Sequence, residues 1–240
     1  MDKSVAAGCR EALPVILGYL PVGFAYGLLA RQAGLSPLLT GLMSLIVFAG
    51  SSQFICVAML GTGAAFLPII ITTFLVNLRH LLMSASLAPY YRKFDGKWLP
   101  LLAFGLTDET FAVVSTALQK EPRDEKYIFA LNMSSYAAWV TGSLFGGLLG
   151  GALAVVTSMG LEYVLYAMFI FLLVIQLNSW RMVAVSLITG LAALVCCKFL
   201  PGQWYIITAT IIGATIGLVI YDGQKIPAAI PGDGSGNLPA

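Results

Sequence analysis

The chain has 240 residues, of which 59% are hydrophobic and 10% are charged, and its formal net charge at pH 7 is +2. An average soluble domain carries roughly a quarter charged residues, so this sequence holds too little charge to cover a water-facing surface. The small net charge, without a dense basic stripe, also argues against a nucleic-acid-binding protein. The composition therefore predicts a protein embedded in a lipid bilayer.

Apolar stretches long enough to cross the hydrocarbon as helices recur along the whole chain. Because they lack the alternation of barrel strands, the predicted fold class is an all-α integral membrane protein with about eight transmembrane helices. The first stretch has no convincing cleavage site and is interpreted as a span rather than a signal peptide. The predicted spans are 12–30, 38–60, 64–91, 98–118, 127–155, 162–178, 181–199 and 204–221.

A single transmembrane domain is predicted over residues 1–225, followed by a disordered tail over 226–240 that is rich in Pro, Gly and Ser. Eight spans place both termini on one side. If that side is cytoplasmic, it holds Lys3, Arg10, Lys120, Arg123, Lys126, Arg181 and Lys225, and the other side holds Arg31, Arg92, Lys93, Lys97 and Lys198. This small excess of basic residues on the side of the termini favours cytoplasmic termini. A re-entrant segment would explain why basic residues flank 98–118 at both ends.

An inverted repeat with broken helices is a further hypothesis, because many transporters are built in this way. A unit of three spans would place its second copy upside down in the membrane. Three pairs of similar stretches suggest such a unit: Gly18, Phe24 and Ala25 with Gly105, Phe111 and Ala112; Ser51-Ser52 with Ser134-Ser135; and 75–83 with 174–182.

Two adjacent carboxyl groups, Asp108 and Glu109, lie near the middle of the apolar segment 98–118. Ionisable groups at the centre of a membrane helix cost about 2.5 kcal/mol or more, so they usually face a cavity or a partner. Neighbouring helical residues point about 100° apart, so the two carboxyls cannot share one face of a regular helix. Either the helix is broken at this point, or one carboxyl pairs elsewhere.

These carboxyls, flanked by Thr107, are predicted to bind an ammonium group or to carry a proton, since a buried carboxyl can take up a proton near neutral pH. The alternative is a structural ion pair with Arg79 or Arg181.

A second polar motif, Asn77-Leu-Arg-His80, lies in the apolar region 64–91. Arg79 stays charged in any realistic setting and therefore needs an anion, either a carboxylate of the chain or that of a substrate. His80, the only histidine of the chain, titrates near neutral pH or serves as a packing residue. Alternatively, 79–80 is a short hairpin between two half-length segments.

The stretch 48–54 contains Ser51, Ser52 and Gln53, whose small hydroxyl and amide groups suit a broken helix with free backbone groups that bind a zwitterion. The alternative is that these small residues only permit tight helix contact. The stretch 132–136 is a looser echo of this motif. Glycines at four-residue spacing, Gly142, Gly146 and Gly150, predict a close helix contact within the chain or with another subunit.

No catalytic or cofactor-binding constellation is recognisable. The sequence contains no nucleophile elbow, no phosphate-binding loop and no CxxC or metal-ligand cluster, so we expect neither an enzyme nor a cofactor. The four cysteines lie in or beside apolar segments, and the adjacent Cys196 and Cys197 lack zinc-site spacing. They are interpreted as packing residues.

At its polar motifs the sequence resembles the large subunit of the AzlC-type branched-chain amino acid exporters of bacteria. The matching stretches are Leu20–Gly27, Phe48–Phe54, Asn77–Leu87 and Leu106–Ala112. The resemblance implies export of valine, leucine, isoleucine or a similar apolar amino acid such as methionine. It also implies a location in the bacterial inner membrane and a small, four-span AzlD-like membrane subunit as partner.

The resulting hypothesis is alternating access around a midplane site driven by proton antiport. Its polar walls would be Gln53, Asn77, Arg79, His80, Thr107, Asp108 and Glu109. Arg79 would attract the substrate carboxylate, while Asp108 or Glu109 would hold the ammonium group or carry a proton. The rival functions are a passive channel for a small solute and a membrane scaffold.

Overall fold

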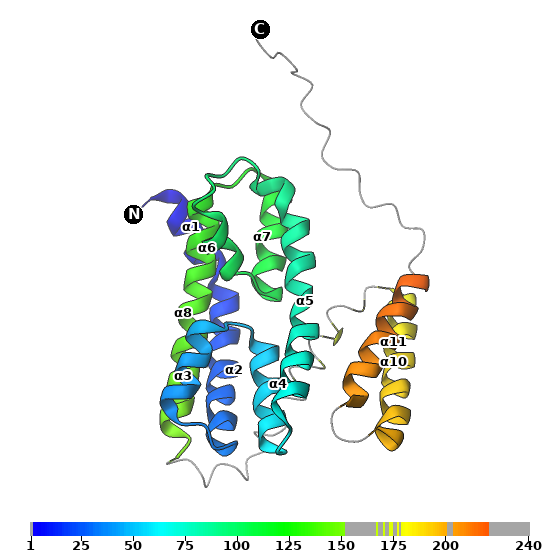
Figure 1. Cartoon of the computed structure of the whole chain (residues 1–240). Helices are drawn as coiled ribbons and strands as arrows, with labels where there is room; N and C mark the ends of the chain where they lie inside the picture. Colours follow the sequence, from blue (N-terminus) through cyan, green and yellow to red (C-terminus); the bar gives the residue numbers. More distant parts are fainter. Residues whose placement is uncertain are drawn as a thin grey trace.

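The computed structural model describes residues 2–151, 179–200 and 204–220, with a few isolated positions between 167 and 177. Every regular element in these ranges is an α-helix, which confirms the all-α class (Figure 1). The predicted span 162–178 and the tail 226–240 lie outside the described ranges. The helices are α1 Lys3–Glu11, α2 Leu13–Gln32, α3 Pro37–Ile46, α4 Gly50–Gly61, α5 Phe66–Tyr91, α6 Leu99–Phe104, α7 Asp108–Lys120, α8 Glu125–Leu149, α10 Trp180–Phe199 and α11 Trp204–Ile220.

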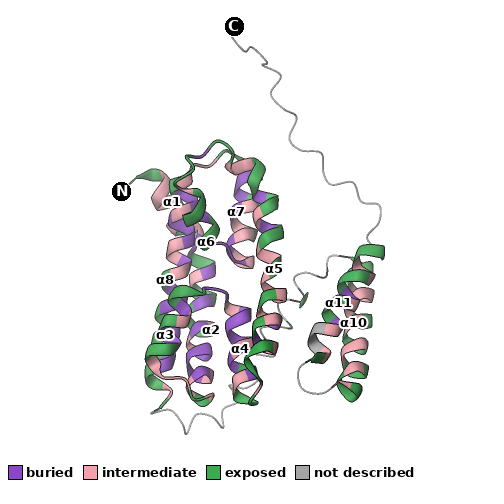
Figure 2. Ribbon diagram, in the orientation of Figure 1, coloured by how far each residue is buried: buried purple, intermediate pink, exposed green. Residues whose placement is uncertain are grey.

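Three helices among the described residues have the length and apolar composition needed to cross a membrane: α2, α5 and α10. Figure 2 shows that buried residues concentrate on α2, α4, α7 and α8. The outer faces of α5 and α10 instead expose large apolar side chains such as Phe74, Leu81 and Leu191. A surface of this kind suits lipid rather than water, which supports a membrane protein.

The closest helix contact joins α2 to α8, and glycines on both helices make it possible. A Cβ atom at Gly23 would lie 2.9 Å from the carbonyl oxygen of Trp139, and one at Gly142 would lie 2.5 Å from that of Leu20. Gly146 faces the carbonyl of Phe24 even more closely. The predicted glycine face therefore packs within the chain, and Gly150, at its end, contacts the side chain of Arg31.

Two pairs of short helices enter the bundle from opposite ends (Figure 1). The pair α3–α4 turns back at Val47–Ala49, and α6–α7 turns back at Gly105–Thr107. At 1.5 Å per residue, the 10 residues of α3 and the 12 of α4 span about 15 and 18 Å, roughly half the hydrocarbon thickness. The pair α3–α4 is therefore a half-depth hairpin. The 6 residues of α6 and the 13 of α7 span about 9 and 20 Å, so neither helix of this second hairpin crosses the hydrocarbon.

These hairpins correct the predicted span list. Segments 38–60 and 98–118 are not single crossings, so eight spans are not confirmed. A pair of half-length helices contains as many apolar residues as one span, which is why hydropathy joined them. The opposite error concerns 64–91: it is the continuous helix α5, and the alternative hairpin at 79–80 is wrong.

An inverted arrangement is present, with pairings other than the predicted ones. The unit α2–α3–α4 is a long helix followed by a hairpin, and α5–α6–α7 repeats this order upside down (Figure 1). The second helices of the two hairpins begin at Gly50 and Asp108, 58 positions apart. Two of the predicted pairs are wrong because they match the long helix α2 with the half helix α7, and α4 with the long helix α8. The third pair, 75–83 with 174–182, lies partly outside the described residues. The stretch 132–136 is also uninterrupted helix within α8.

Basic residues gather at one end of the bundle, which we call the N-terminal face. It is formed by α1, the α5–α6 loop and the α7–α8 loop (Figure 1). Ion pairs fasten it: Arg123 lies 3.1 Å from Glu11, and Lys126 lies 3.0 Å from Asp2. In residues 2–151 this face holds Lys3, Arg10, Arg92, Lys93, Lys97, Lys120, Arg123 and Lys126, and the opposite face holds Arg31.

The α2–α8 contact generates the first prediction. Gly146→Leu forces a side chain against the backbone of Phe24 and should lower the free energy of unfolding by roughly 1–3 kcal/mol. Thermal unfolding of the purified protein in detergent measures the effect. Gly190→Ala in α10 is the matched control, since nothing lies within 4 Å of its added methyl group. Equal stability of the two variants would contradict the close contact.

Candidate functional site

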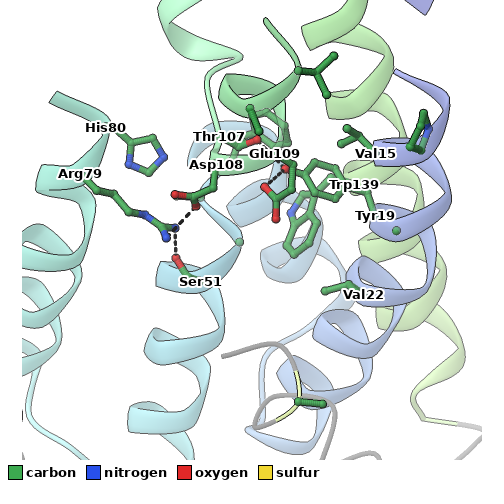
Figure 3. Close-up of a pocket in the computed structure, with 18 residues that line it drawn as sticks. Val15, Tyr19, Val22, Ser51, Arg79, His80, Thr107, Asp108, Glu109 and Trp139 are labelled. Carbon is green, nitrogen blue, oxygen red and sulfur yellow. Dashed lines mark hydrogen bonds and ion pairs between the residues drawn. The ribbon is translucent and has the colours of Figure 1, made fainter. Parts of the chain in front are cut away.

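A cavity of about 520 Å³ lies where the turns of the two hairpins meet (Figure 3). The long helices α2, α5 and α8 complete its walls. Most of its lining is apolar, including Val15, Val22, Phe48, Val113 and Trp139. Its polar groups are Tyr19, Ser51, Arg79, His80, Thr107, Asp108 and Glu109.

The turn of α6–α7 is built by local hydrogen bonds. The Thr107 N–H donates to Thr110 Oγ1 at 2.8 Å, and the Thr110 N–H donates to Thr107 Oγ1 at 3.2 Å, so the two residues form a capping box. Asp108 and Glu109 occupy the first turn of α7, where the helix dipole favours negative charge. A broken helix is thus how both adjacent carboxyls reach one cavity.

Arg79 forms an ion pair with Asp108, with 2.7 Å between Nη1 and Oδ2. Its Nη2 donates to the hydroxyl of Ser51 in the first turn of α4. A single guanidinium thus connects α5 with both hairpins (Figure 3). The ion pair that the sequence allowed as an alternative for Asp108 is present, and both side chains keep 26% exposure in the cavity.

Glu109 turns toward α2 instead. The Tyr19 hydroxyl donates to Glu109 Oε2 at 2.7 Å and lies 2.6 Å from Thr107 Oγ1. Sequence reasoning missed Tyr19, because a lone tyrosine in an apolar helix is indistinguishable from a packing residue. Its neighbours Gly18 and Pro21 were the only local irregularity.

The turn of α3–α4 contains a strained residue and lacks the side-chain cap that the α6–α7 turn has. Phe48 adopts a φ of 41°, a strained value for a bulky residue, and packs edge-on against Tyr136. The helix α4 begins at Gly50 after Ala49, and no side chain caps it. The predicted helix break near Ser51 is confirmed, and it leaves the positive end of the α4 dipole at the cavity.

Three predicted site residues do not line the cavity. Ser52 donates to Asn77 Oδ1 at 2.5 Å, which connects α4 to α5. Gln53 is fully buried: its Nε2 donates to Ser44 of α3 at 3.0 Å, and its Oε1 accepts from the indole of Trp139 at 3.0 Å. These hydrogen bonds stabilise the α3–α4 hairpin, and the three residues themselves lie outside the cavity lining.

His80 does line the cavity, with its Nδ1 3.2 Å from the carbonyl oxygen of Asn77 one turn earlier in α5. Within the described residues, no group of three or more His, Cys, Asp or Glu side chains is arranged to hold a metal ion. The charged groups that line the cavity are one guanidinium and two carboxylates, beside an uncapped helix start. Such a set suits a small molecule that carries both charges and an apolar body.

Residues 14–153 match the family described as AzlC protein. The chain is 32% identical to "Inner membrane protein YgaZ" of Escherichia coli, covering 93% of this chain and 83% of that protein. It is 33% identical to "Branched-chain amino acid transport protein AzlC" of Bacillus subtilis, covering 70% and 65%. An "Uncharacterized membrane protein" of Helicobacter pylori is 31% identical, covering 90% and 95%. No solved structure matches the chain significantly.

The ion pair generates the second prediction. Asp108→Asn leaves the Arg79 guanidinium without its anion and should lower the free energy of unfolding by roughly 1–3 kcal/mol. The double variant Arg79→Gln/Asp108→Asn removes both charges and should recover part of that loss. Thermal unfolding of the four proteins of this cycle gives the coupling energy. Additive losses would show that the two side chains do not interact.

Proposed function

Because the chain belongs to the AzlC protein family, we propose that it is a secondary transporter that exports branched-chain or similar apolar amino acids. The Bacillus subtilis relative is a branched-chain amino acid transport protein by name, which supports branched-chain amino acids as the substrate class. The observation that carries the proposal is the amphipathic cavity at the meeting point of two broken helices. Discontinuous helices with their ends at mid-depth are a recurrent way to build a transporter site.

The cavity supplies a partner for each part of a zwitterion. The uncapped start of α4, beside Arg79, favours the substrate carboxylate. The carboxylates at the start of α7 favour its ammonium group. Val15, Val22 and Val113 give the branched side chain an apolar surface. In this site Arg79 acts together with α4, because its own charge is already shared with Asp108.

Transport follows from the hairpins by alternating access. Each hairpin fills one half of the bundle depth on its own side of the cavity, while the close α2–α8 contact forms a fixed frame. Movement of one hairpin away from the cavity opens that side, and movement of the other opens the opposite side. The sequence has no nucleotide-binding loop, so the proposed energy source is proton antiport, in which one α7 carboxylate would hold either a proton or the substrate ammonium group.

The setting proposed for this transporter is the bacterial inner membrane, together with a small AzlD-like four-span subunit. The broad apolar faces of α5 and α10 leave room for lipid and for such a subunit. The N-terminus is cytoplasmic, since basic residues concentrate on the N-terminal face far more than the eight-span count implied.

Transport itself is the third prediction. Proteoliposomes that contain the chain with its small subunit should show saturable counterflow of labelled L-valine that responds to a pH gradient. The double variant Asp108→Asn/Glu109→Gln should lose this flux, whereas Glu121→Gln, in the loop after α7, should keep it. Flux that neither saturates nor responds to pH would indicate a channel. Absence of flux from the intact complex would indicate a scaffold.

Orientation is the fourth prediction. In a background without the four native cysteines, Ala65→Cys in the α4–α5 loop should react in whole cells with a membrane-impermeant maleimide. Lys97→Cys in the α5–α6 loop should react only after the membrane is opened. The reverse pattern would place the N-terminal face outside the cell.

A further inference from the structure

We infer that the two adjacent carboxylates of α7 have separate roles, and that Glu109, positioned by Tyr19, binds the α-ammonium group of the amino acid. This inference rests on the proposed function. Figure 3 shows the two carboxylates at the start of α7 with different partners.

The charge of Asp108 is already compensated. Its Oδ2 lies 2.7 Å from Arg79 Nη1, and Arg79 is held in place by Ser51 as well. An ammonium group that approached Asp108 would compete with a guanidinium that is fixed to two helices. The guanidinium would then be left without an anion in an apolar cavity, which is costly. Asp108 therefore serves to hold Arg79 and to connect α5 with α7.

Glu109 has no such cation. Among the described residues, its carboxylate forms no ion pair, and its hydrogen bond comes from the neutral hydroxyl of Tyr19 to Oε2. No hydrogen bond from the described chain reaches Oε1, which leaves this oxygen with free acceptor capacity. The cavity groups Arg79, Asp108 and Glu109 sum to one uncompensated negative charge. A primary ammonium group supplies the missing positive charge and donates hydrogen bonds.

Tyr19 fixes the direction of the Glu109 side chain. Because the Tyr19 hydroxyl donates to Glu109, the hydroxyl of Thr107 is left to donate to the Tyr19 oxygen. The donors thus run in one direction toward the carboxylate, which strengthens each bond. Tyr19 is 7% exposed, and its ring packs edge-on against Trp139 with 5.4 Å between ring centroids, so its hydroxyl has little freedom. Tyr19 is a positioning residue for Glu109.

Besides Tyr19, Arg79, Asp108 and Glu109, the cavity lining contains the titratable side chain of His80. It lies beside Arg79 on α5, while Tyr19 and Glu109 face each other from α2 and α7. The assignment therefore predicts that recognition of the amino group depends on Glu109 and Tyr19 and is separable from the Arg79–Asp108 pair.

Binding to the purified complex tests this assignment. The affinity for labelled L-valine is measured directly, and competition by 3-methylbutanoate, the analogue without the amino group, is measured beside it. Glu109→Gln should weaken valine binding at least tenfold, as expected for a lost charge-assisted hydrogen bond. It should leave competition by 3-methylbutanoate unchanged or stronger, because this anion gains from the loss of a negative charge. Tyr19→Phe should weaken valine binding roughly fivefold.

Controls separate the outcomes. Glu121→Gln, outside the cavity, should bind like the wild type, and thermal unfolding confirms that each variant is folded. If wild-type complex binds no aliphatic amino acid, the proposed function fails. If the wild type binds valine and Glu109→Gln binds it equally well, the ammonium assignment fails while the transporter stands. The assignment also fails if Asp108→Asn, rather than Glu109→Gln, selectively weakens valine relative to 3-methylbutanoate.

Discussion

The structure depends on how three charged side chains are accommodated at the middle of an apolar bundle. Arg79, Asp108 and Glu109 would each be expensive on the lipid face of a continuous helix. The chain breaks the helix before Asp108, which turns both carboxylates toward the interior and places them at the favourable end of the α7 dipole. Arg79 reaches this point from α5 and compensates one of the two charges. The charge of Glu109 remains, and it makes the cavity suited to a cationic group.

The two hairpins have the same backbone arrangement, but the helix starts that they bring to the cavity carry opposite charge. Both turn back at mid-depth, and each second helix begins at the cavity, at Gly50 and at Asp108. One start is uncapped and presents a positive dipole end, whereas the other is capped by Thr107 and carries two acidic side chains. An inverted repeat thus produces a site with a positive and a negative side. That polarity is suited to a zwitterion with an apolar side chain.

Much of this could be predicted from the sequence, because buried charge is rare and conspicuous. Composition gave the membrane class, and Arg79, Asp108 and Glu109 stood out as the groups that need partners. The hairpins could not be derived, because hydropathy gives the length of an apolar segment and does not reveal that the chain turns back within it. Tyr19 was missed for a related reason: its role comes from one contact with a residue 90 positions away. The two predicted repeat pairs that are wrong, in α2 with α7 and in α4 with α8, rested on small and aromatic residues that are common in any membrane helix.

The central claim is that an apolar amino acid binds between the starts of α4 and α7, at the turns of two half-depth hairpins. An electron cryo-microscopy map of the complex in lipid nanodiscs with saturating L-valine tests it most directly. Ligand density is expected between Gly50 and Glu109, with both turns at the middle of the bilayer. Density at another place, or continuous membrane-crossing helices over 38–60 and 98–118, would contradict it.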